Sequence, residues 1–101
     1  MLIDVEHRAD ATTLVVQGDV DVTSAYDLYV AAIGQGETDK RVVTLDLAGV
    51  SFIDSVGLSM LIRSRDELRS GGGQLVLQHP SRQVKNLLAV TALDGQFQIL
   101  D

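Results

Sequence analysis

The amino-acid sequence predicts a single α/β domain in which helices pack against a mixed β-sheet, in the order β-β-α-β-α-β-α-β. Three observations predict this class. Short apolar runs rich in β-branched residues alternate along the chain with stretches of helical periodicity. Glycine and other turn-forming residues separate the two kinds of segment. The length of 101 residues is enough for one hydrophobic core but not for two, so residues 1–101 are expected to form one domain.

Two strands are expected at the N-terminus, over residues 2–6 and 13–17, with a short turn at residues 9–11 between them. An acidic loop over residues 18–22 then leads into a helix, for which Thr23 is a suitable N-cap. The apolar face of this helix is formed by Ala25, Leu28, Tyr29 and Ala32.

A strand, a helix and a second strand follow at the centre of the chain. Residues 42–47 are almost continuously apolar, as in a strand that is covered on both faces. Asp54 and Ser55 are both good N-cap residues for the helix. Its apolar face contains Leu58, Leu61, Ile62 and Leu68. Glycines 71–73 end it, because glycine adopts the left-handed cap conformation without a Cβ clash, and a strand over residues 74–78 comes next. Ser55 is therefore expected beyond the carboxyl end of a strand, at the positive end of a helix.

The C-terminal part is expected to add a helix and a short strand. The only proline, Pro80, stands just before the helix. The buried side of that helix is predicted to carry Val84, Leu87 and Leu88, and Phe97 and Ile99 alternate in the final strand.

Two side chains need a separate interpretation. Arg65 falls in the middle of a presumed buried face, so either its stem packs while its guanidinium reaches solvent, or the phase of that helix is shifted. Tyr26 lies at the edge of the apolar face beside Tyr29, where packing is the commoner role and contact with a partner is the alternative.

The composition excludes several classes of function. No apolar run approaches the roughly 20 residues that span a bilayer. The N-terminus is acidic where a signal peptide is basic, so we expect a cytoplasmic protein that is not inserted in a membrane. The net charge of −6 argues against general nucleic-acid binding. The absence of cysteine removes disulfides, thiolate catalysis and Cys-based zinc sites.

The residues give little support to an enzyme. His7 and His79 are the only histidines, and neither adjoins Ser55 in sequence, whereas a serine nucleophile needs an adjacent base. The glycine run lacks the Lys-Ser/Thr of a phosphate-binding loop, and the acidic pair and lysine of a receiver domain are not evident. We therefore expect a binding protein that has no cofactor.

The acidic loop is a poor calcium site. Asp19, Asp21 and Thr23 match alternate ligand positions, but Ser24 replaces the turn glycine and Val30 the final glutamate. The residues alone favour an ordinary acidic surface loop, with no metal.

Two short motifs are more informative. Asp54-Ser55-Val56-Gly57-Leu58 follows a strand ending in Leu-Asp-Leu and opens a helix. Gly18-Asp19-Val20-Asp21, followed by Thr23-Ser24-Ala25, precedes the first helix. Both resemble signatures of the STAS domain, a family named for sulfate transporters and anti-sigma factor antagonists, and the resemblance covers essentially the whole chain.

This resemblance implies an anti-sigma factor antagonist. In such proteins the serine after the aspartate is phosphorylated by a partner kinase, which points to Ser55. Val56 replaces the second serine of the usual pair, and Ser59 is a weaker candidate. The implied partner-binding residues are Asp19, Asp21, Thr23, Asp54, Ser55, Val56, Gly57 and Ser59. The implied partners are an anti-sigma factor with serine kinase activity and a serine phosphatase, and the free protein is expected to be a monomer.

Other functions stay open at this point. The chain could be a non-switching STAS accessory subunit of a lipid-transport complex or of a stress-signalling assembly. A nucleotide-binding domain is a further alternative, and it predicts that ATP or GTP raises the melting temperature. The serine could also serve only as a helix cap.

Overall fold

The secondary structure follows the predicted order in a computed structural model that describes residues 1–8, 11–35 and 42–101. The strands are β1 (Leu2–Arg8), β2 (Ala11–Gln17), β3 (Val42–Gly49), β4 (Gln74–Gln78) and β5 (Gln98–Leu100). The helices are α1 (Ala25–Gln35), α2 (Ser55–Ser70) and α3 (Arg82–Val90). Residues 9–10 of the predicted turn lie outside the described residues. Within the described ranges, no helix has both the length and the apolar character needed to cross a membrane.

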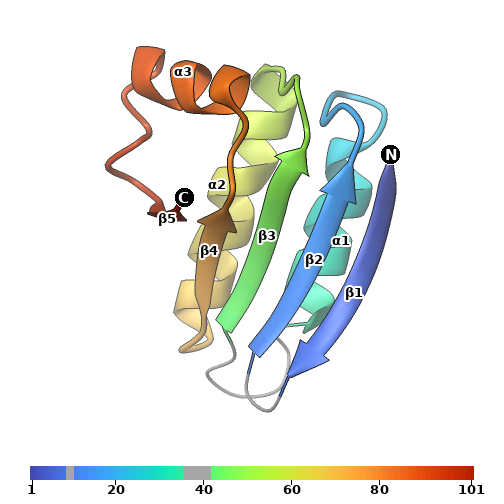
Figure 1. Ribbon diagram of the computed structural model, residues 1–101. Helices are drawn as coiled ribbons and strands as arrows, with labels where there is room; N and C mark the ends of the chain where they lie inside the picture. The colour runs from blue at the N-terminus through green and yellow to red at the C-terminus, as the bar shows by residue number, and fades with distance from the viewer. Residues whose placement is uncertain (9–10, 36–41) are drawn as a thin grey trace.

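The strands form one mixed sheet in the order β1-β2-β3-β4-β5. β1 is antiparallel to β2, and every other neighbouring pair is parallel. Helices α1 and α2 lie on the same face of the sheet (Figure 1). This placement is expected, because right-handed crossovers that step across a sheet in one direction put their helices on one face. The predicted α/β class and element order are confirmed.

The expectation that the central strand is covered on both faces is wrong. Burial along β3 alternates, with Val43, Leu45 and Leu47 buried and Val42, Thr44 and Asp46 only half-buried. The buried set faces α1 and α2, and the half-buried set lies on the opposite face of the sheet. The sequence did not distinguish a strand covered on one face from a strand covered on both. Val42 is apolar and so extends the apolar run, although it lies on the half-buried face.

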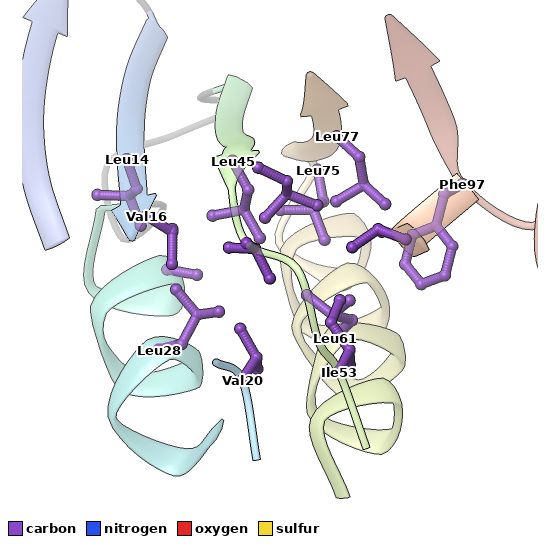
Figure 2. Packing of buried hydrophobic residues seen from close by; sticks show 14 of the residues in the cluster. Leu14, Val16, Val20, Leu28, Leu45, Ile53, Leu61, Leu75, Leu77 and Phe97 are labelled. Carbon is purple, nitrogen blue, oxygen red and sulfur yellow. The ribbon is translucent and has the colours of Figure 1, made fainter. Parts of the chain in front are cut away.

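The core lies between the sheet and helices α1 and α2. Leu14, Val16, Leu45 and Leu77 from the strands point toward the helix side chains, including Leu61 (Figure 2). Full burial of one such side chain stabilises the fold by about 1.5–3 kcal/mol. α3 contributes Val84 and Leu88 to the same cluster, as its sequence pattern predicts, while Leu87 is half-buried.

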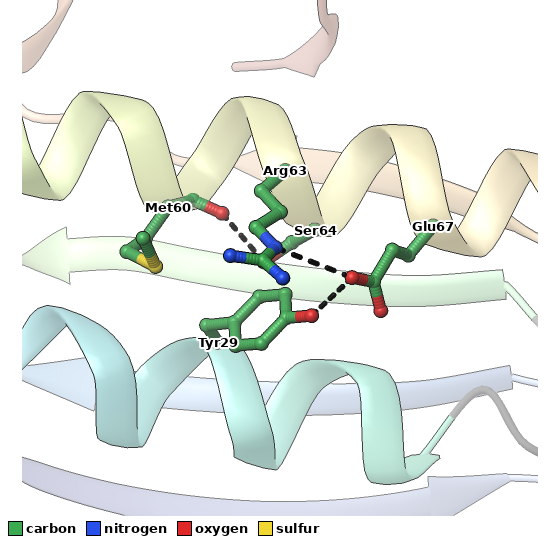
Figure 3. A network of polar contacts seen from close by, with 5 residues as sticks. All are labelled: Tyr29, Met60, Arg63, Ser64 and Glu67. Carbon is green, nitrogen blue, oxygen red and sulfur yellow. Dashed lines mark hydrogen bonds and ion pairs between the residues drawn. The ribbon is translucent and has the colours of Figure 1, made fainter.

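The two main helices also meet through polar side chains. The Tyr29 hydroxyl of α1 donates a hydrogen bond to Glu67 of α2, and this bond raises the pKa of the tyrosine. Arg63 pairs with the same carboxylate at 3.3 Å and places its guanidinium 5.1 Å from the centre of the Tyr29 ring (Figure 3). These contacts join α1 to α2 beside the apolar core.

The end of α2 agrees with the prediction. Gly71 is the C-cap residue with φ −85°, and Gly72, the next residue, has φ +84°. The left-handed conformation thus falls on the glycine directly after the C-cap, where it is usual, and the Gly72 N–H donates to the Arg69 carbonyl at 3.0 Å. The Gly73 N–H returns to the Leu68 carbonyl at 2.7 Å and closes the last turn.

Arg65 is explained by a tertiary contact. Its side chain is only 14% exposed, and its Nη1 donates to the Gln96 carbonyl at 2.8 Å. The guanidinium also lies 5.3 Å from the centre of the Phe97 ring and pairs with Asp66. The stem is packed, as the first interpretation predicted. The guanidinium, which that interpretation placed in solvent, instead bonds α2 to the segment that precedes β5.

Replacing Arg65 should therefore destabilise the protein. We expect Arg65→Met to lower the free energy of unfolding by about 1–3 kcal/mol, because the Gln96 carbonyl loses a charged hydrogen-bond donor and Phe97 loses the contact with the guanidinium. Arg69→Met is the matched control, since Arg69 is an exposed arginine one turn further along α2, and it should change stability by no more than about 0.5 kcal/mol. Urea unfolding followed by circular dichroism measures both values, and equal stability of the two variants would contradict the assignment.

Candidate functional site

The two sequence motifs meet in space. The chain that leaves β2 runs beside the chain that leaves β3, beyond the carboxyl ends of both strands. The Gly18 N–H donates to the Gly49 carbonyl, and the Val20 N–H to the Phe52 carbonyl, each at 3.0 Å. The Asp54 N–H returns to the Val20 carbonyl at 3.1 Å. Because parallel neighbouring strands end at the same edge of a sheet, motifs more than 30 residues apart form one surface.

Asp54 holds this surface together. Its Oδ1 accepts a hydrogen bond from the Gly57 N–H at 2.8 Å and so provides the N-cap of α2. Its Oδ2 accepts from the Val22 N–H at 3.1 Å, in the loop before α1. Of the two candidate caps, the aspartate is therefore the one used.

Ser55 is left exposed as the first residue of α2. In the part of the chain that the structure describes, its hydroxyl makes no hydrogen bond, while its carbonyl accepts one from the Ser59 hydroxyl at 2.9 Å. The two candidate serines thus differ: the Ser55 side chain is available, and the Ser59 hydroxyl is bonded within the helix.

Gly57 is present because no side chain fits there. A Cβ atom at this position would lie 2.5 Å from the Val20 carbonyl oxygen and 2.7 Å from the Ile53 Cγ2. The first turn of α2 is therefore packed directly onto the loop that leaves β2. Gly57 is buried, so its contribution to a partner surface is the close approach of two backbones and not a contact of its own.

In the acidic loop, Asp21 accepts the hydrogen bonds at the start of α1, a role that the sequence analysis assigned to Thr23. Thr23 is not the N-cap of the first helical turn. Instead the Asp21 Oδ1 accepts hydrogen bonds from the Thr23 N–H at 3.0 Å and the Thr23 hydroxyl at 2.7 Å, and the Asp21 carbonyl accepts from the Ala25 N–H at 2.7 Å. The bonds from Thr23 lower the pKa of Asp21, so this carboxylate is ionised at neutral pH.

Ser24 completes this loop from the inside. It is buried, its hydroxyl donates to the Asp19 carbonyl at 2.8 Å, and it accepts from the Asp21 N–H at 3.1 Å. The side chain of Asp19 stays exposed. Asp19, Asp21 and Thr23 therefore lie at the same edge of the sheet as Ser55, on a loop with fixed geometry.

Exposed apolar side chains accompany the two motifs. Val56, which the sequence analysis names as a partner-binding residue, is exposed, and so are Val22 and Phe52, which it does not name. A hollow of about 320 Å³ adjoins Phe52, between this loop and α3, and is lined by Ser51, Phe52, Ile53, Gln83, Val84 and Leu87. For Val22 and Phe52 the only sequence signal is a large apolar residue inside a loop.

The histidines make contacts away from Ser55. The Nδ1 of His7 on β1 lies 3.4 Å from the Thr12 hydroxyl, and the Nδ1 of His79 lies 3.5 Å from an Asp46 carboxylate oxygen. Within the described residues, no group of three or more His, Cys, Asp or Glu side chains is arranged to hold a metal ion. What the site offers is an exposed hydroxyl among apolar and acidic side chains, which is the chemistry of a binding surface.

Comparison with known proteins places this arrangement in a class of α/β domains that share its mixed sheet. An anti-sigma factor antagonist from Mycobacterium paratuberculosis superposes with a TM-score of 0.81 at 25% identity, over 98% of this chain and 84% of that one. The anti-sigma factor antagonist SpoIIAA, solved in its unphosphorylated form, superposes with a TM-score of 0.79 at 16% identity, over 99% of this chain and 89% of that one.

The sequence comparisons define the family. A family model for the STAS domain matches residues 3–101. A STAS-domain containing protein of Pseudomonas aeruginosa (strain UCBPP-PA14) is 30% identical over 87 residues, which cover 86% of this chain and 85% of that protein. The chain belongs to the STAS domain family, and the resemblance of its two motifs is confirmed.

The close packing at Gly57 can be tested directly. Gly57→Ala should lower the free energy of unfolding by about 1–3 kcal/mol or more, because the new methyl group overlaps the Val20 backbone. Gly34→Ala is the control, since a Cβ atom at that glycine of α1 meets nothing within 4 Å, and alanine there should be neutral or stabilising by up to about 1 kcal/mol. Thermal unfolding measures both, and a neutral Gly57→Ala would contradict the described packing.

The division of roles between Asp54 and Ser55 makes a second prediction. Asp54→Ala should destabilise the protein by about 1–2 kcal/mol, because α2 loses its cap and the Val22 N–H loses its acceptor. Ser55→Ala should change stability by no more than about 0.5 kcal/mol. Denaturant unfolding of both variants decides the matter, and a larger loss for Ser55→Ala than for Asp54→Ala would make the serine the cap.

Proposed function

We propose that this protein is an anti-sigma factor antagonist that binds an anti-sigma factor while Ser55 is unmodified and releases it when Ser55 is phosphorylated. The observation that carries the proposal is the exposed Ser55 hydroxyl at the start of α2, where Asp54 performs the capping. Membership of the STAS family and similarity to anti-sigma factor antagonists of known structure support it.

The position of Ser55 is suited to carry a phosphate without loss of the fold. A phosphoserine brings about −1.5 to −2 charges at neutral pH. The N-terminus of a helix favours negative charge, because its first N–H groups point outward and the dipole is positive there. The carboxylate of Asp54 opposes the added charge, but in solvent this repulsion is screened over about 8–10 Å. The modified protein should therefore stay folded.

The same charge should disrupt a bound partner. Val56 adjoins Ser55 and Val22 is bonded to Asp54, and both expose apolar surface, so a partner that buries them would also have to desolvate the phosphate. Carboxylates of the site add negative charge nearby, and a partner surface of the same sign adds several kcal/mol of repulsion. A change from almost fully bound to almost fully free requires a difference of about 5.5 kcal/mol in binding free energy, which these terms can supply together.

The proposed partners follow from this cycle. The anti-sigma factor is itself a serine kinase, which transfers the γ-phosphoryl group of ATP to the Ser55 oxygen, releases ADP and loses its hold on the product. A serine phosphatase hydrolyses the phosphoserine and restores binding. The protein acts in the cytoplasm as a substrate and ligand in this cycle, and performs no chemistry of its own.

Intact mass spectrometry tests the proposal. The purified protein is incubated with ATP and each anti-sigma factor of the kinase type encoded in its genome, beside Ser55→Ala and Ser59→Ala variants. We expect one kinase to add a single phosphate, a mass increase of about 80 Da, to the wild type and to Ser59→Ala but not to Ser55→Ala. Binding of that kinase should be lost in Ser55→Asp.

The contrary results are distinct. A phosphate on Ser55→Ala would move the acceptor to another residue. Absence of both binding and phosphorylation with every such kinase would refute the proposed function and favour a non-switching STAS subunit.

A further inference from the structure

One side of α1 carries large apolar side chains that are exposed in the described part of the chain. Val22 in the preceding turn and Tyr26 and Val30 in α1 are 69%, 64% and 46% exposed. Tyr26 and Val30 are four residues apart in α1, so they lie one helical turn from each other. Val22 stands four residues before Tyr26, in the turn that the Ala25 N–H closes onto the Asp21 carbonyl, and we group the three as one row. A lone exposed apolar residue is ordinary, whereas a row of them marks an interaction surface. We call this row the α1 stripe.

The α1 stripe begins at the Ser55 site. The Val22 N–H is bonded to the Asp54 carboxylate that caps α2, and Val56 exposes its own side chain in the first turn of α2. The Tyr26 ring lies 5.8 Å from the Tyr29 ring, which stands against α2 (Figure 3). The stripe thus extends the proposed partner-binding surface from the loops along α1, beside its contact with α2.

The charges around the α1 stripe indicate what would cover it. Asp27 in the first turn of α1 and Asp19 in the preceding loop are exposed carboxylates, and the chain carries a net charge of −6. Arg63, whose guanidinium lies over the Tyr29 ring, is already paired with Glu67. The open positions along the stripe are therefore apolar with an acidic border, which complements a basic amphipathic segment.

We propose that the α1 stripe binds an amphipathic helix of the anti-sigma factor whose apolar side chains are flanked by lysine or arginine. This inference rests on the proposed function and assigns a second contact to the same complex. Tyr26 and Val30, the part of the stripe on α1, supply affinity that does not depend on phosphorylation, and Ser55 near the Val22 end supplies the control. Substitutions of Tyr26 or Val30 should therefore weaken binding of the unmodified and phosphorylated forms by the same factor.

Calorimetric titration with the kinase that modifies Ser55 tests this, with ADP in place of ATP. We expect Tyr26→Ser and Val30→Asp each to weaken binding at least about tenfold, as for a central interface contact. Val90→Asp is the matched control, since Val90 is 85% exposed on α3 and should bind within about twofold of the wild type. Circular dichroism melting of each variant verifies that it is folded.

The outcomes separate this inference from the proposed function. If Ser55→Asp abolishes binding while Tyr26→Ser and Val30→Asp bind like the wild type, the stripe contact is refuted and the proposed function stands. If the wild type binds no such kinase, both are refuted. If sedimentation shows a dimer of the free protein that Val30→Asp dissociates, a second copy covers the stripe and the inference is overturned.

Discussion

The two oxygens of the Asp54 carboxylate make the interaction on which the site depends. One satisfies an N–H group in the first turn of α2, and the other holds Val22 in the neighbouring loop. The first N–H groups of any helix need acceptors, and a serine in this place would ordinarily provide one. Because the aspartate performs this role, the adjoining serine is exposed without a structural duty.

The topology of the sheet makes this arrangement possible. β2 and β3 are parallel neighbours, so the loops that leave them meet at one edge and bond to each other through Val20, Phe52 and Asp54. Gly57 then lets the first turn of α2 rest on the Val20 carbonyl. The side chains of Val22 and Val56, on the loop and on the helix that meet in this way, remain at the surface.

The sequence was sufficient for the order of the elements and for the position of the Ser55 site, because these follow from local periodicity and a short motif. It was insufficient where two local solutions compete. Aspartate and serine are both suitable N-cap residues, and the structure uses Asp54 and not Ser55. Likewise, Asp21 accepts the hydrogen bonds of the turn that Thr23 was expected to cap. Tertiary contacts were also invisible: Arg65 bonds to Gln96, 31 residues away, and the alternating burial of β3 depends on helices covering only one face of the sheet.

If phosphorylation of Ser55 is to release the partner, the α1 stripe can contribute only a limited share of the binding free energy. Phosphate at Ser55 changes only the terms near the N-terminus of α2, so the binding energy of the stripe remains after modification. Each 1.4 kcal/mol from the stripe tightens both forms about tenfold. If the stripe alone held the partner at cellular concentrations, phosphorylation could not release it. The stripe must therefore be weak by itself, and a contact made by only three exposed side chains fits that requirement.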